Sequence, residues 1–240
     1  MKVAAVQYKP PKGAPTVARQ ALARLVDDAG QQGARLIVCP EMATSGYVWA
    51  NPSQVLPHCE PAHGPTLAAL APLAAQHGAW VVCGLPERDE RDGALYNAAL
   101  VIGPDGALVA CYRKMYLYQA DTTWARPGGQ AVLIDCELGR LAPAICMDIN
   151  SWSLPRLLVA EGVDILAFCT NWVEEGDDVH AYWAERLGGW PGVMVAGNTW
   201  GADCGTRFSG RSAVMGPGGR VLGALPATGD DVLVVEIDPA

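Results

Sequence analysis

Three apolar stretches of this sequence each end in one side chain that can do chemistry. Glu41 follows the run RLIVCP, Lys114 follows ALVACYR, and Cys146 follows LAPAI. A carboxylate can take the proton of a thiol, a thiolate attacks carbonyl carbon atoms, and an ammonium group stabilises the oxyanion that forms. These residue types suit acyl transfer through a thioester, with Glu41 as the base, Cys146 as the nucleophile and Lys114 as the oxyanion stabiliser.

Each of the three residues also has a structural explanation. Glu41 and Lys114 could form an ion pair at the end of a sheet, and a free cysteine is usually a small buried hydrophobic residue. The chain contains eight cysteines, at positions 39, 59, 83, 111, 136, 146, 169 and 204. None has a C-x-x-C partner or zinc-site spacing, so we expect free thiols and no metal site. Only the joint occurrence of the three residues favours catalysis.

The elements that would carry these residues alternate between strands and helices. The first half is expected to contain strands at 3–8, 35–40 and 79–84, helices at 16–32 and 65–77, and a hairpin over 97–113. The second half is expected to contain strands at 141–149, 164–171 and 192–198, helices at 154–161 and 178–188, and a hairpin over 212–225. This order predicts an α/β fold with two similar halves. Ligands bind beyond the carboxyl ends of strands in such sheets, where the three residues lie.

Composition restricts the class of protein. The chain has 240 residues, of which 50% are hydrophobic and 18% are charged, as expected for a globular protein. Its net charge of −8 and the absence of a basic run weigh against nucleic acid or an anionic membrane as a partner. The apolar stretch near the N-terminus is too short for a signal peptide, and no segment has the ~20 apolar residues of a membrane helix. We expect a cytoplasmic protein.

Four ordered blocks of the sequence resemble the nitrilase superfamily of carbon–nitrogen hydrolases. The family's glutamate block is similar to LIVCPEMATSGY, its lysine block to GLPERDERDGALYNAALVIGPDGALVACYRKMYL, and its cysteine block to ICMD. Its late segment is similar to GNTWGADCGTRFSGRSAVMGPGGRVLG. The resemblance implies a single domain over residues 1–240, folded as a four-layer α-β-β-α sandwich with an internal pseudo-twofold. It also implies a Glu41–Lys114–Cys146 triad, no cofactor, and a homodimer.

Two segments depart from the family pattern. In DTTWARPGG, Asp121 takes the place of a second glutamate, and its shorter side chain could either join the catalytic group or cap a turn. After the nucleophile the chain reads MDINSWSLPR, which is similar to some amidase branches. We therefore expect Met147 and Asn150 beside the substrate.

Aromatic residues in the loops after strands are candidates for the wall of a pocket. Tyr47 and Trp172 are the two we select, although large rings also pack at sheet ends for structural reasons. A narrow, ring-lined pocket would favour a small, uncharged acyl group.

The function that the resemblance implies is hydrolysis of a small carboxamide to a carboxylate and ammonia. Two alternatives keep the fold, namely hydrolysis of N-carbamoyl amino acids and hydrolysis of nitriles. The carbamoyl alternative needs a basic residue for the substrate carboxylate, and Arg126, Arg156 and Arg207 are the candidates. A third alternative is a non-catalytic binding protein. An enzyme is expected to have a low-pKa thiol at Cys146, and a binding protein needs none.

Overall fold

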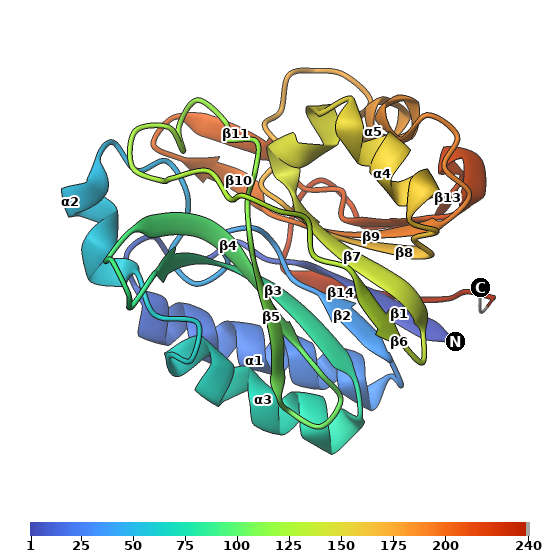
Figure 1. Ribbon diagram of the computed structural model, residues 1–240, viewed down its shortest axis with the longest axis horizontal. Coiled ribbons are helices and arrows are strands. Elements are labelled where there is room, and N and C mark those ends of the chain that lie inside the picture. The colour runs from blue at the N-terminus through green and yellow to red at the C-terminus, as the bar shows by residue number, and fades with distance from the viewer. Residues whose placement is uncertain (239–240) are drawn as a thin grey trace.

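The computed structural model describes residues 1–238, and its two halves repeat one order of elements (Figure 1). The first half consists of β1 (Lys2–Gln7), α1 (Pro15–Gln31), β2 (Leu36–Val38), α2 (Pro52–Val55), α3 (Pro65–His77), β3 (Trp80–Arg88), β4 (Leu95–Ile102) and β5 (Leu108–Arg113). The second half consists of β6 (Ile134–Cys136), β7 (Gly139–Ile145), α4 (Ser153–Ala160), β8 (Ile165–Thr170), α5 (Val179–Leu187), β9 (Val193–Asn198), β10 (Trp200–Asp203), β11 (Thr206–Ser209), β12 (Ala213–Met215), β13 (Val221–Ala224) and β14 (Asp231–Glu236). Short 3₁₀ helices occur at Leu56–His58, Cys146–Asn150 and Pro217–Gly219.

The strand order of the sheet explains the internal repeat. The order is β5-β4-β3-β2-β1-β9-β8-β7-β6, with β1, β2 and β3 parallel to one another and β7, β8 and β9 parallel to one another. In each half an antiparallel hairpin follows the third parallel strand, namely β4–β5 and β12–β13. We call strands β1–β5 with β14 the first sheet and strands β6–β9 with β12 and β13 the second sheet; the two sheets are joined where Gln7 of β1 pairs with Asn198 of β9.

Three hydrophobic clusters separate four layers of secondary structure. One cluster lies between the first sheet and helices α1 and α3, one between the two sheets, and one between the second sheet and helices α4 and α5. In β1, Val3 and Ala5 belong to the central cluster, whereas Ala4 and Val6 face α1 and α3. Strands buried on both faces are apolar throughout, which is why the sequence shows continuous runs. The predicted α-β-β-α sandwich is confirmed.

One predicted boundary is wrong at a position that matters. The strand expected over 141–149 ends at Ile145, and the chain turns into the 3₁₀ helix that begins at Cys146. Cys146 adopts a φ of 41°, in the left-handed region that non-glycine residues seldom occupy. The apolar pattern of the sequence continues through Ile149, so it could not reveal this turn.

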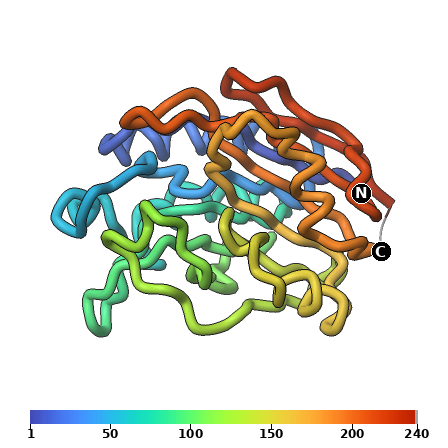
Figure 2. Tube along the Cα trace, turned by 90° about the horizontal axis from the view of Figure 1, so that it is seen from above, coloured from blue at the N-terminus to red at the C-terminus, as the bar shows by residue number. Residues whose placement is uncertain are grey.

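The last strand closes the first sheet. β14 pairs antiparallel with β1, and the backbone of Ile237 bonds to that of Met1, so the described N- and C-terminal segments lie side by side (Figure 2). Within residues 1–238, no helix has the length and apolar character needed to cross a membrane.

Gly84 of β3 allows two chain segments to approach closely just beyond the end of β2. A Cβ atom at Gly84 would lie 2.5 Å from the carbonyl oxygen of Pro40 and 2.6 Å from the Cα of Glu41. The backbone of Gly84 also bonds to Pro40 and to Ala43 on either side of Glu41. Because glycine has no side chain, the Glu41 backbone can lie this close to β3.

We predict that Gly84→Ala lowers the free energy of unfolding by about 1–3 kcal/mol, because the new methyl group must push two backbones apart. Urea denaturation followed by circular dichroism measures this. Gly129→Ala is the matched control, since no atom lies within 4 Å of a Cβ at Gly129, and its effect should stay within about 0.5 kcal/mol. Equal stability of the two variants would contradict the packing explanation.

Candidate active site

The three residues predicted from strand ends lie together, and Asp121 joins them. Glu41 follows β2, Lys114 follows β5 and Cys146 follows β7, while Asp121 comes from the loop after Lys114. The side chains of Glu41, Lys114 and Asp121 are fully buried, and Cys146 is 8% exposed. Buried charges occur in proteins only where they are paired and hydrogen-bonded, so the fold must supply partners for these groups.

Lys114 lies between two carboxylates. Its Nζ is 2.7 Å from Oε1 of Glu41 and 2.6 Å from Oδ2 of Asp121. The side-chain amide of Asn97, in β4, donates to Oε1 of Glu41 at 2.7 Å and to Oδ1 of Asp121 at 3.2 Å. One ammonium and one amide thus fix both carboxylates at once.

Backbone amides complete the binding of the two carboxylates. The N–H of Asn171, just after β8, donates to Oε2 of Glu41 at 2.9 Å, and the N–H of Tyr118 donates to Oδ2 of Asp121 at 3.0 Å. Asp121 therefore caps a turn of its own loop and also contacts Lys114.

The burial of this network shifts the pKa values of its members. Burial raises the pKa of Glu41, and Asp121 raises it further, against the opposing effect of Lys114. Burial alone would lower the pKa of Lys114, but the two carboxylates outweigh it and the pKa rises. Lys114 is therefore an ammonium at neutral pH, and Glu41 holds a proton more readily than an ordinary carboxylate.

The thiol of Cys146 differs from the low-pKa cysteine that we expected. Burial raises its pKa well above the usual value, the charge of Glu41 raises it further, and Lys114 only partly offsets them. Cys146 therefore holds its proton more tightly than an ordinary cysteine does. Glu41 is the carboxylate with the stronger effect on this thiol.

Asp148 holds the turn at Cys146, and sequence reasoning missed it. Its carboxylate is 1% exposed and accepts four hydrogen bonds. The donors are the backbone N–H groups of Ile145 (2.8 Å), Met115 (3.2 Å) and Tyr116 (2.9 Å) and the hydroxyl of Tyr112 (2.6 Å). These bonds connect the turn at Cys146 to the chain just after Lys114. The available signal was an aspartate two residues after Cys146 in an otherwise apolar stretch.

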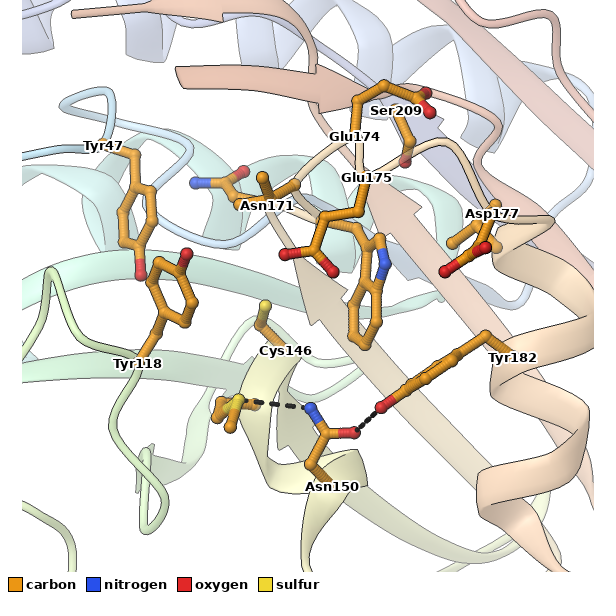
Figure 3. Close-up of a pocket in the computed structure, with 14 residues that line it drawn as sticks. Tyr47, Tyr118, Cys146, Asn150, Asn171, Glu174, Glu175, Asp177, Tyr182 and Ser209 are labelled. Carbon is orange, nitrogen blue, oxygen red and sulfur yellow. Dashed lines mark hydrogen bonds between the residues drawn. The ribbon is translucent and has the colours of Figure 1, made fainter. Parts of the chain in front are cut away.

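A cavity of about 210 Å³ lies over Cys146 (Figure 3). All four residues expected at the substrate line it, namely Tyr47, Met147, Asn150 and Trp172. The hydroxyl of Tyr182, a residue that we did not select, donates to Oδ1 of Asn150 at 2.8 Å, and its ring lies against Trp172 with centroids 5.3 Å apart. Asn150 is thus fixed as part of the wall.

We predict that Asp148→Asn lowers the free energy of unfolding by about 2–4 kcal/mol, because an amide cannot accept all the N–H groups that face this carboxylate. Chemical denaturation of the purified variant checks it. Tyr112→Phe removes one donor of the four and should cost only about 0.5–2 kcal/mol. Asp135→Asn, on a carboxylate that is 76% exposed, is the control and should change stability little. A small effect of Asp148→Asn on stability would contradict the conclusion that this carboxylate holds the turn at Cys146.

Comparisons with known proteins agree on one family. Residues 2–240 match the model of the Carbon-nitrogen hydrolase family. The chain is similar to the protein N-terminal amidase of Schizosaccharomyces pombe, with 27% identity over 99% of this chain and 100% of that protein. A nitrilase of Pyrococcus abyssi is 29% identical over 99% of this chain and 90% of its own.

Solved structures agree with the sequence relatives. A variant of the Nesterenkonia AN1 amidase from the nitrilase superfamily is 25% identical, with a TM-score of 0.86 over 100% of this chain and 90% of that one. Because the family model matches residues 2–240, this chain belongs to the carbon–nitrogen hydrolases, in the amidase-like branch of the nitrilase superfamily, and is an enzyme.

Proposed function

We propose that the protein is an amidase that hydrolyses a small carboxamide to a carboxylate and ammonia through a thioester on Cys146. The observation that carries the proposal is the buried Glu41–Lys114 pair beside a thiol that opens into a closely lined cavity. The amidases among its relatives support the same reaction class.

In the proposed acylation, Glu41 takes the proton of Cys146 while the sulfur attacks the carbonyl carbon and a C–S bond forms. Lys114 and a backbone N–H after Cys146 donate to the oxyanion, which is the preorganised stabilisation that acyl transfer requires. When the tetrahedral intermediate collapses, the C–N bond breaks. Glu41 gives its proton to the leaving nitrogen, and ammonia departs.

In the proposed deacylation, a water molecule takes the place of ammonia. Glu41 removes a proton from the water as its oxygen attacks the thioester carbonyl, and the C–S bond then breaks. The proton returns to the sulfur, so the neutral thiol is restored and the carboxylic acid leaves. A carboxylate whose pKa is raised suits this double role because it accepts and releases a proton with little cost.

We assign Asp121 a positioning role in this proposal. Its contact with Lys114 stabilises the ammonium form, and its charge raises the pKa of Glu41. Although its side chain is shorter than the family's usual glutamate, Asp121 reaches Lys114 directly, at 2.6 Å.

The alternative substrates receive less support from the cavity. Arg126 pairs with Asp92, Arg156 lines a neighbouring groove beside Trp152, and Arg207 is absent from the cavity lining, so no candidate arginine faces the space over Cys146 within residues 1–238. An N-carbamoyl amino acid would place its carboxylate there without a cationic partner.

We predict that Cys146→Ala abolishes the hydrolysis of butyramide and the acyl adduct seen by intact-protein mass spectrometry, because the thioester cannot form. Glu41→Gln should lower kcat/KM at least about a hundredfold, since proton transfer is lost. Cys204→Ala, at an exposed thiol, is the control and should leave ammonia release unchanged. Turnover by the Cys146→Ala variant would contradict the assignment of Cys146 as the nucleophile.

The raised pKa of Glu41 predicts an acid limb in the pH profile of kcat/KM. Activity should fall as pH falls through that pKa, because protonated Glu41 cannot accept the thiol proton. Asp121→Asn removes a charge that raises this pKa, so the limb should move to lower pH. An acid limb that stays in place, or moves to higher pH, would contradict the effect of Asp121 on the pKa of Glu41, whatever happens to the maximal rate.

A further inference from the structure

One side of the cavity is acidic. Three carboxylate residues of the loop after β8 line it, namely Glu174, Glu175 and Asp177, and all three are exposed to solvent. None of them forms an ion pair with any residue in the part of the chain that the structure describes. No lysine or arginine lines the same cavity. The carboxylates are therefore available to a ligand.

The three carboxylates point in different directions. Figure 3 shows the carboxylate of Glu175 over Cys146 and that of Asp177 on the side of Tyr182, whereas the carboxylate of Glu174 turns away. Glu174 also accepts a hydrogen bond from the N–H of Gly176 at 3.0 Å, which holds it in the loop. Two of the three charges thus face the ligand space.

Buried polar groups without partners lie in the same cavity. The hydroxyl of Tyr47 and Oδ1 of Asn171 have no hydrogen-bond partner in the described structure, and these residues are 2% and 1% exposed. Such groups carry a cost unless a ligand or water meets them. Figure 3 places both on the far side of Cys146 from Asp177, so the cavity has polar groups at both ends.

We infer that the preferred substrate is an amide whose acyl chain carries an ammonium group, held by Glu175 and Asp177. The inference rests on the proposed amidase function and names the class of its substrate. The carboxamide is at Cys146, near Tyr47 and Asn171, and the ammonium group is at the acidic side. Two unpaired carboxylates attract a cation, are nearly indifferent to a methyl group, and repel a carboxylate. The aromatic residues of the sequence led us to expect a small, uncharged acyl group. The inference replaces that expectation with a small acyl group that carries a positive charge.

Three amides with the same two-methylene spacer test the inference. 3-Aminopropanamide, butyramide and succinamate end in an ammonium, a methyl and a carboxylate group, respectively. At neutral pH and low salt, kcat/KM should be about tenfold higher for 3-aminopropanamide than for butyramide, and lowest for succinamate. The preference should shrink as salt is added, because the carboxylates are exposed to solvent.

Paired variants locate the preference. The double variant Glu175→Gln with Asp177→Asn should reduce the ratio of kcat/KM between 3-aminopropanamide and butyramide to about twofold or less, chiefly by raising KM for the cation. Glu174→Gln removes an equal charge from the same loop and keeps an acceptor for Gly176, so the ratio should stay close to the wild-type value.

The outcomes separate the two proposals. If kcat/KM for butyramide equals that for 3-aminopropanamide, or kcat/KM is highest for succinamate, the preference for a cationic substrate is overturned. The proposed amidase function is then unaffected. If the ratio persists in the double variant, or falls equally in Glu174→Gln, the assignment to Glu175 and Asp177 is overturned. If no amide or other acyl substrate is hydrolysed at all, the proposed function itself fails and this inference fails with it.

Discussion

The ion cluster of Lys114, Glu41 and Asp121 is the constraint on which the rest of the structure depends. Moving a charge out of water costs several kcal/mol per ion, and only close pairing with further hydrogen bonds offsets that cost. The partners come from the ends of β2 and β5 and from the loop beyond β5. The cluster can therefore form only when the strands of the first sheet are correctly aligned, so the fold and the site specify each other.

The cluster holds two carboxylates against one ammonium, and this imbalance adds to the effect of burial on the pKa of Cys146. A neighbouring cation alone would favour a thiolate at Cys146, but burial and the charge of Glu41 outweigh Lys114. A neutral thiol reacts slowly with oxidants and alkylating agents, since the thiolate is the reactive form. We therefore expect the Cys146 thiol to react more slowly with such reagents than an ordinary exposed cysteine does.

The parts of this molecule that depend on local pattern could be predicted from the sequence. Apolar runs that end in Glu41 and Lys114 show strands whose carboxyl ends carry charge, and the family resemblance supplied the layer order. The turn at Cys146 was missed, because the residue that holds it, Asp148, acts through donors far away in the sequence, and its presence alone does not show where the strand ends. The acidic loop after β8 was missed for a similar reason, since exposed carboxylates in a loop look alike whether or not they face a cavity.

The left-handed backbone at Cys146 connects these observations. A non-glycine residue in that region is strained and persists only where its surroundings hold it. Asp148 supplies that restraint by binding the N–H of Ile145 together with N–H groups of the chain that follows Lys114. The same carboxylate thus fixes the turn at Cys146 and the segment that follows Lys114. In the mechanism that we propose, preorganised groups lose much of their effect over about 1 Å, and this one buried aspartate keeps Cys146 and Lys114 in register.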